Sequence, residues 1–117
     1  MTVKEFLRDT YKDERYIFRP HVVCADGYKV SIQAGSGLYS CPRENVLEYT
    51  AVELGFPNMA DELIMEYIDC PDDDPTKTVY GYVPVDIVQQ LMDKHGGIVR
   101  LLKAINKPDV IDLALFL

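Results

Sequence analysis

The first hydrophobic residues of the chain recur with the spacing of a short amphipathic helix. Val3, Phe6 and Leu7 fall on one helical face within residues 2–11. They follow Thr2-x-x-Glu5, a capping box in which two side chains satisfy free backbone amides at a helix start. These features predict a helix that packs one face on the core, followed by a polar break at residues 12–15.

The pattern then changes to that of a β-hairpin. Residues 20–25 and 28–33 are rich in β-branched and aromatic side chains and flank Asp26-Gly27, the strongest two-residue hairpin signal. With a two-residue turn, the facing pairs that form the apolar face are Ala25–Tyr28, Val23–Val30 and His21–Ile32. The other, more polar face then carries Val22, Cys24, Lys29, Ser31 and Gln33.

The middle of the chain predicts a helix, a strand and a second helix. A short helix is expected to begin at Ser40-Cys41-Pro42 and to turn Val46, Leu47 and Tyr49 inward. A strand near residues 50–56 ends at Pro57. A helix that opens at Asn58 is expected to bury Ala60, Leu63, Ile64, Tyr67 and Ile68. Residues 70–75, with two prolines and three aspartates, predict an exposed loop.

The last third predicts a strand over residues 78–83, then a helix that starts at Pro84 and ends at Gly96-Gly97. The helix is expected to pack a stripe of Ile87, Val88, Leu91, Met92 and His95. His95 stands in its last turn, where the helix dipole favours a cation. Residues 98–106 predict one more helical face, and residues 110–117 are almost wholly apolar.

This order of elements predicts an α+β fold of two layers, in which a small antiparallel sheet packs with amphipathic helices. The sheet is expected to contain the hairpin 20–25/28–33 and the strands near 50–56 and 78–83. The length of 117 residues indicates a single domain over 1–117. We expect residues 98–117 to be a C-terminal extension. Its apolar part, 108–117, would be buried on the core, at a dimer interface or under a partner protein.

Composition narrows the class of protein. Hydrophobic residues make up 48% and charged residues 26%, as in ordinary soluble globular proteins. No apolar run is long enough to cross a bilayer, and the charged N-terminus is unlike a signal peptide. Three cysteines without close spacing argue against a disulfide framework. We therefore expect a cytoplasmic protein with no membrane partner.

The net charge of −7 comes entirely from the middle of the chain. Residues 1–43 carry +2, residues 78–117 are neutral, and residues 44–77 carry −9. One interpretation is a set of solvated helix faces and a loop; the other is a surface that docks on a basic protein or imitates nucleic acid. Because nucleic-acid binders usually present a basic face, no direct nucleic-acid partner is expected.

Partner-binding candidates combine this acidic stretch with two tyrosines of the predicted last strand. Thr78, Tyr80 and Tyr82 should share one strand face, either as core or as an interaction platform. The candidate partner-binding residues are Glu53, Asp61, Glu62, Glu66, Asp69, Asp72, Asp73, Asp74, Tyr80 and Tyr82.

The enzymatic alternative depends on Cys41. It stands at a predicted helix start and two residues before Arg43, two features that lower a thiol pKa, but it would need His21 or His95 nearby. His21-x-x-Cys24 has ligand-like spacing, yet these residues fall on opposite strand faces and no Cys-x-x-Cys pair exists. We therefore predict no metal site and no cofactor, and we assign no catalytic residue.

Several segments also carry a resemblance. They are Cys41-Pro42-Arg43-Glu44-Asn45, Val52-Glu53-Leu54-Gly55-Phe56-Pro57, Glu62-Leu63-Ile64-Met65-Glu66-Tyr67, Thr78-Val79-Tyr80-Gly81-Tyr82-Val83-Pro84 and His95-Gly96-Gly97-Ile98. With them, residues 2–98 resemble a group of short uncharacterised proteins of gut Gram-positive bacteria and their phages or mobile elements. The resemblance implies an accessory role. By analogy, small acidic proteins of such elements include inhibitors of host defence nucleases.

The first hypothesis is therefore a small non-enzymatic protein-binding module, an inhibitor or adaptor that meets a basic partner through its acidic surface. Alternatives are a nucleic-acid-mimicking inhibitor of a host defence nuclease, a small cysteine-dependent enzyme using Cys41, and a structural homodimer closed by the apolar tail.

Overall fold

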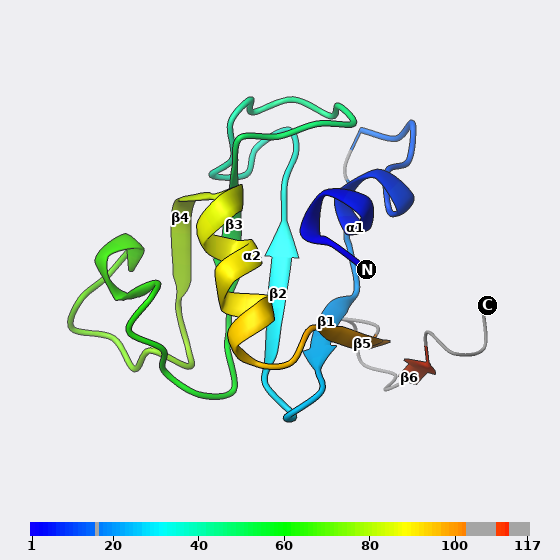
Figure 1. Cartoon of the computed structure of the whole chain (residues 1–117). Helices are drawn as coiled ribbons and strands as arrows, with labels where there is room; N and C mark the ends of the chain where they lie inside the picture. The colour runs from blue at the N-terminus through cyan, green and yellow to red at the C-terminus, as the bar shows by residue number, and fades with distance from the viewer. Residues whose placement is uncertain (16, 103–109, 113–117) are drawn as a thin grey trace.

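Six antiparallel strands form one sheet in the computed structural model, in the order β4-β3-β2-β1-β5-β6, and two helices lie on one of its faces (Figure 1). The structure describes residues 1–15, 17–102 and, by their backbone, 110–112. The elements are α1 Val3–Asp9, β1 His21–Cys24, β2 Lys29–Gln33, β3 Ala51–Gly55, a 3-10 turn η1 Met65–Tyr67, β4 Val79–Pro84, α2 Val85–Lys94, β5 Ile98–Leu102 and β6 Val110–Asp112. The predicted α+β fold of two layers is confirmed.

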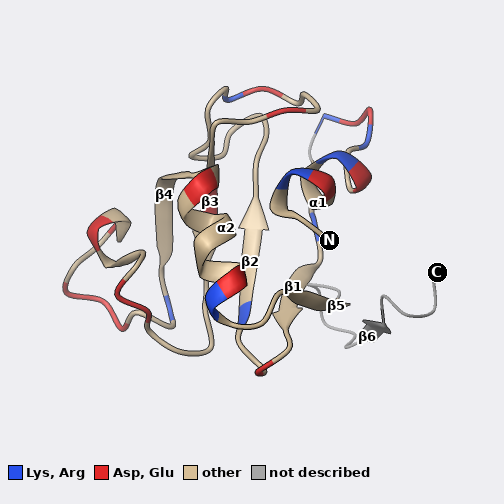
Figure 2. Ribbon diagram, in the orientation of Figure 1, with Lys and Arg blue, Asp and Glu red and all other residues tan. Residues whose placement is uncertain are grey.

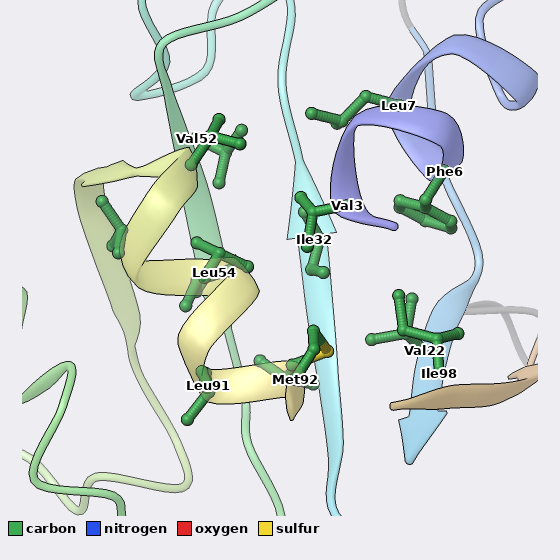
Figure 3. Close-up of a cluster of buried hydrophobic side chains, with 14 of the residues drawn as sticks. Val3, Phe6, Leu7, Val22, Ile32, Val52, Leu54, Leu91, Met92 and Ile98 are labelled. Carbon is green, nitrogen blue, oxygen red and sulfur yellow. The ribbon is translucent and has the colours of Figure 1, made fainter. Parts of the chain in front are cut away.

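The hydrophobic core lies between the helices and the sheet (Figure 3). The helices contribute Val3, Phe6, Leu7, Val88, Leu91 and Met92, and the sheet contributes Val22, Val30, Ile32, Val52 and Leu54. Burying one such side chain stabilises a fold by about 1.5–3 kcal/mol. A hydrogen bond of 2.8 Å from the Val3 amide to Gln89 Oε1 joins the two helices.

Both helices begin where the sequence predicts, and α2 also ends there. The Glu5 amide donates to Thr2 Oγ1 at 3.0 Å, and the Thr2 amide donates to Glu5 Oε1 at 2.8 Å, so the capping box of α1 is formed. Pro84 precedes the first residue of α2, and the helix ends before Gly96, whose φ is +92°. Glycine adopts this left-handed conformation at little cost.

The hairpin forms at Asp26-Gly27, but its register differs from the prediction by one residue. Val22 pairs with Val30. The Cys24 amide donates to the Tyr28 carbonyl at 2.7 Å, and the Gly27 amide donates to the Cys24 carbonyl at 2.9 Å. The connection therefore has three residues, with Gly27 at a φ of +94°.

The shift reverses the two faces of β1. Val22 and Cys24 face the core, whereas Val23 and His21, which were predicted there, lie on the opposite face. The β2 residues predicted for the apolar face are buried as expected. A one-residue slip has this effect because successive strand side chains point to opposite sides.

No helix forms at the predicted start of Ser40-Cys41-Pro42. The Cys41 amide donates to the Ala51 carbonyl at 3.0 Å, and the Thr50 amide donates to the Cys41 carbonyl at 2.9 Å. This pairing with the start of β3 holds the chain extended. Tyr49 is buried as expected, but Leu47 is exposed.

The helix predicted to follow Asn58 is reduced to the short turn η1. The carboxylate of Asp61 accepts a hydrogen bond of 3.0 Å from the Leu63 amide, which closes a local turn in place of a helical one. Of the predicted face, Ile64 is fully buried. Hydrophobic spacing alone therefore predicted the wrong element here.

Residues 98–102 form a strand and not the predicted helix. β5 pairs with β1 on one side and β6 on the other, and Ile98 belongs to the core. β5 and β6 are thus strands of the sheet, and β5 contributes to the core. The backbone of 110–112 forms β6, while the side chains of 110–112 and residues 103–109 and 113–117 lie outside the described residues. The tail hypotheses remain predictions.

A β-bulge separates the two tyrosines of β4. Leu54 pairs with Tyr80 and Val52 pairs with Val83, so Gly81 and Tyr82 together oppose Glu53. The extra residue breaks the two-residue alternation. Tyr80 is consequently buried in the core and Tyr82 is 47% exposed, and the prediction that they share one face was wrong.

Candidate functional site

Most acidic residues predicted as a partner surface gather on one loop. Residues 57–78, here called the acidic loop, connect β3 to β4 and form the lobe beside β4 in Figure 2. Its exposed carboxylates are Glu62, Glu66, Asp69, Asp72, Asp73 and Asp74. Lys77 is its one basic residue. The loop therefore presents a concentrated negative charge at one end of the sheet.

Asp61 ties the beginning of the acidic loop to the end of α2. Its side chain is only 3% exposed. Oδ2 lies 2.8 Å from His95 Nε2, and Oδ1 accepts hydrogen bonds from Lys94 Nζ at 3.1 Å and from the Leu63 amide. A buried carboxylate requires such partners because it has lost its water shell. Asp61 is therefore an anchor and not part of the accessible acidic surface.

His95 lies between carboxylates from two different elements. Its Nδ1 is 2.6 Å from Asp26 Oδ2 in the β1–β2 turn, and its Nε2 meets Asp61. The imidazole stacks on Tyr28 with 4.0 Å between ring centroids. We call Asp26, Asp61 and His95 the carboxylate–histidine cluster. Because each ring nitrogen faces a carboxylate oxygen, the doubly protonated imidazolium satisfies both contacts.

The cluster favours the charged form of each member. Burial alone lowers the pKa of His95, but its hydrogen bonds to Asp26 and Asp61 and their charges outweigh burial and raise the pKa. The Tyr28 amide and then His95 lower the pKa of Asp26. Burial raises the pKa of Asp61, but its hydrogen bonds reverse this and leave the pKa lowered. The result is a charged clamp that joins the acidic loop, α2 and the β1–β2 turn.

Neighbouring titratable groups are poorly suited to acid–base chemistry. The Tyr28 hydroxyl is buried without a hydrogen-bond partner among the described residues, and burial strongly raises its pKa. Burial, followed by the charge of Asp26, raises the pKa of Cys24 to about 11. Both nitrogens of His95 are already engaged. The arrangement therefore serves as a structural clamp and offers no free base.

Further contacts hold the acidic loop along β4. The buried Tyr80 donates its hydroxyl to the Pro75 carbonyl at 2.6 Å. The Asp69 amide donates to the Val79 carbonyl at 2.9 Å, and Ile68 forms an isolated bridge with Tyr80. The Tyr80 hydroxyl thus fixes the part of the loop around Pro75. The loop is fixed near its beginning by Asp61 and near its end by Tyr80.

An exposed aromatic pair, Tyr39 and Tyr82, lies beside the β4 bulge. Their ring centroids are 5.8 Å apart, and the Arg43 guanidinium lies 5.5 Å from the Tyr39 ring centroid. The Tyr39 amide donates to Glu53 Oε1 at 3.4 Å. Partial burial raises the pKa of Glu53, with the charge of Asp69 adding to it. Glu53 therefore holds the backbone of Tyr39 beside β3.

Two exposed aromatics adopt a backbone conformation that bulky residues rarely take. Phe56, directly before the acidic loop, has a φ of +50°, and Tyr82 has a φ of +53°. Phe56 is 50% exposed. A non-glycine residue in this region costs about 1–2 kcal/mol. Exposed aromatic residues with a strained backbone thus flank the acidic loop along the chain.

The chemistry expected at other residues finds little support. Cys41 is exposed, but the helix expected to activate it is absent, and the ring nitrogens of His95 face Asp26 and Asp61. Within the described ranges, no group of three His, Cys, Asp or Glu side chains could hold a metal ion. Neither described helix is long and apolar enough to cross a membrane.

The structure brings together part of the predicted site. Eight of the ten candidates are at least partly accessible, while Asp61 and Tyr80 are buried. The sequence analysis missed Tyr39 and the carboxylate–histidine cluster, because no sequence pattern connects Asp26 with Asp61 and His95. The position of His95 at a helix end was the only signal available. No protein-family model, curated protein or solved structure matches the chain.

Proposed function

We propose that the protein is a non-enzymatic protein-binding module, an inhibitor or adaptor that meets a basic partner through the acidic loop. The observation that carries the proposal is that six exposed carboxylates lie on one loop that Asp61 and Tyr80 fix near both ends. Because the loop is already ordered, its carboxylates attract a basic surface without the entropic cost of ordering a flexible segment.

The neighbouring aromatics supply the second element of such an interface. Charged groups steer association and provide specificity, whereas buried aromatic anchors provide most of the affinity. Tyr39, Tyr82 and Phe56 are exposed. Phe56 directly precedes the acidic loop, and Tyr82, which contacts Tyr39, lies on β4, which follows the loop. A partner with basic residues around an apolar patch would match this combination.

The test compares two variants of equal net charge. In the first, Glu62, Glu66 and Asp69 are replaced by lysine; in the second, Asp9, Asp13 and Glu44 are replaced by lysine outside the loop. Proteins that co-purify with the wild type are identified by mass spectrometry, and their affinities for all three proteins are measured. We expect the first variant to lose binding and the control to retain it.

Ionic strength provides an independent readout. Affinity carried by exposed charges should fall as salt rises from about 0.05 to 0.5 M, because the screening length shortens. Equal binding by both triple variants, or no co-purifying protein with the wild type, would refute the proposal. Circular dichroism establishes that each variant is folded.

A further inference from the structure

A groove lies between one face of α1 and the loop that precedes β3. Lys4, Leu7 and Arg8 share this helical face, and Tyr11 continues it, at the spacing i, i+3, i+4 and i+7. Opposite them lie residues 47–50, and together they enclose a cavity of about 470 Å³. A second hollow of about 580 Å³ continues the groove toward Tyr11. Small-molecule sites commonly measure about 300–1,000 Å³.

The walls of the groove are apolar. Leu7 and Tyr49 line it and are 1% and 6% exposed, so they form a fixed floor. Leu47 also lines it and is 45% exposed. An apolar body placed here would cover Leu47 and remove its surface from water.

The rim of the groove carries two cations and one anion. Lys4 and Arg8 project from α1, and Arg8 Nη1 lies 3.0 Å from Glu48 Oε1. Glu48 belongs to both hollows, so this ion pair crosses the groove between them. The Arg8 and Glu48 side chains are 51% and 84% exposed, and ion pairs this exposed contribute little net free energy. A competing carboxylate can therefore replace Glu48.

A buried cation behind the floor adds to the positive potential. Arg19 is fully buried; it donates to the Thr10 hydroxyl and to the carbonyls of Leu7 and Ala34. Its guanidinium lies 5.9 Å from the Tyr49 ring centroid. No carboxylate pairs with it among the described residues. The Arg19 guanidinium is thus adjacent to the floor residues Leu7 and Tyr49.

We propose that this groove binds a small amphipathic carboxylate, a single carboxylate group on an aliphatic or aromatic body. The carboxylate takes the place of Glu48 at Arg8, with Lys4 on the same rim, and the body covers Leu7, Leu47 and Tyr49. α1, which forms one wall of the groove, and the acidic loop lie on opposite sides of β2 in Figure 2. This site is therefore independent of the proposed protein-binding surface.

The full chain is titrated with octanoate as the probe and with octanol as its neutral counterpart. Binding is measured by the NMR chemical shifts of the protein. Octanoate should shift the signals of Leu7, Leu47 and Tyr49 at lower concentration than octanol does. Arg8→Gln or Lys4→Gln should weaken octanoate binding about two- to fivefold, because each removes an exposed ionic contact. Lys77→Gln, which removes a distant lysine, should change nothing.

Glu48→Gln distinguishes a binding role from a structural one. It removes the competing anion, so octanoate should bind up to about fivefold more tightly. A loss of structure would instead weaken binding. The proposal is overturned if octanoate shifts none of the groove signals, if octanol binds equally well, or if Glu48→Gln weakens binding.

Discussion

Replacing His95 by glutamine removes the cation that holds Asp26 and Asp61 together. The Asp61 side chain is 3% exposed, so the variant retains a buried carboxylate with only Lys94 and the Leu63 amide as partners. Removing one member of a buried ion pair costs about 3–5 kcal/mol. Because Lys94 remains, we expect a loss of about 3 kcal/mol in the free energy of unfolding. This is a large part of the roughly 5–15 kcal/mol that stabilises a typical domain.

Urea unfolding at pH 6, followed by circular dichroism, measures this loss. The double-mutant cycle with Asp61→Asn isolates the interaction between His95 and Asp61, for which we expect a coupling of at least about 1 kcal/mol. Asp86→Asn, an exposed change on the same helix, serves as the control. A loss below about 1 kcal/mol for His95→Gln, or a coupling of zero, would refute the clamp.

The same cluster determines how stability depends on pH. The pKa of His95 is raised above 6.5 in the folded state, so its contribution is complete below pH 6.5 and is lost as the pH rises through the folded value. The pKa values of Asp26 and Asp61 are lowered below 3.8, so their contributions are complete above pH 3.8 and are lost as the pH falls. Stability should therefore be greatest between these limits. His95→Gln should remove the alkaline decline, and an unchanged decline would contradict the assignment.

Three further results are expected. Gly96→Ala should lower the free energy of unfolding in urea by about 2 kcal/mol, which is more than Gly97→Ala should cost. Both glycines have a positive φ, but only a Cβ at residue 96 would lie 2.8 Å from the Ala25 Cβ, so equal losses would contradict this. Iodoacetamide at neutral pH should modify the exposed Cys41 and leave the buried Cys24 unmodified until the protein unfolds. Mass spectrometry measures both, and modification of Cys24 in the native protein would contradict its burial. Arg19→Met should lower the free energy of unfolding in urea by about 2–3 kcal/mol, because three hydrogen-bond acceptors lose a charged donor; an unchanged midpoint would contradict that role.

Sequence patterns correctly predicted the elements that have strong local signals. They failed for elements whose structure depends on contacts between residues distant in sequence. The capping box at Thr2 and the end of α2 at Gly96 are determined by neighbouring residues. The hairpin register depended on whether Gly27 closes a two-residue or a three-residue turn, which the Asp26-Gly27 pair alone does not specify. The apolar spacing of residues 98–106 predicted a helix, whereas pairing with β1 makes residues 98–102 a strand.

The candidate site was predictable to the extent that it depends on composition. The concentration of exposed carboxylates between β3 and β4 follows from the charge of −9 in residues 44–77, although a helix was predicted after Asn58 where the structure has a loop. The burial of Asp61 could not be predicted, because it depends on His95, which is 34 residues away in sequence. The separation of Tyr80 from Tyr82 likewise depends on one extra residue opposite Glu53, which hydrophobic alternation does not reveal.

The position of β1 between β2 and β5 has a consequence for synthesis on the ribosome. β1 and β2 are neighbours in sequence, but β5 ends at Leu102, about 80 residues after β1 begins. Until β5 has emerged from the exit tunnel, the β5-facing side of β1 has unpaired backbone groups that can pair with another chain. The nascent polypeptide cannot complete its sheet before that point. Chaperone protection late in translation therefore matters more for this topology than for one built only from sequential hairpins.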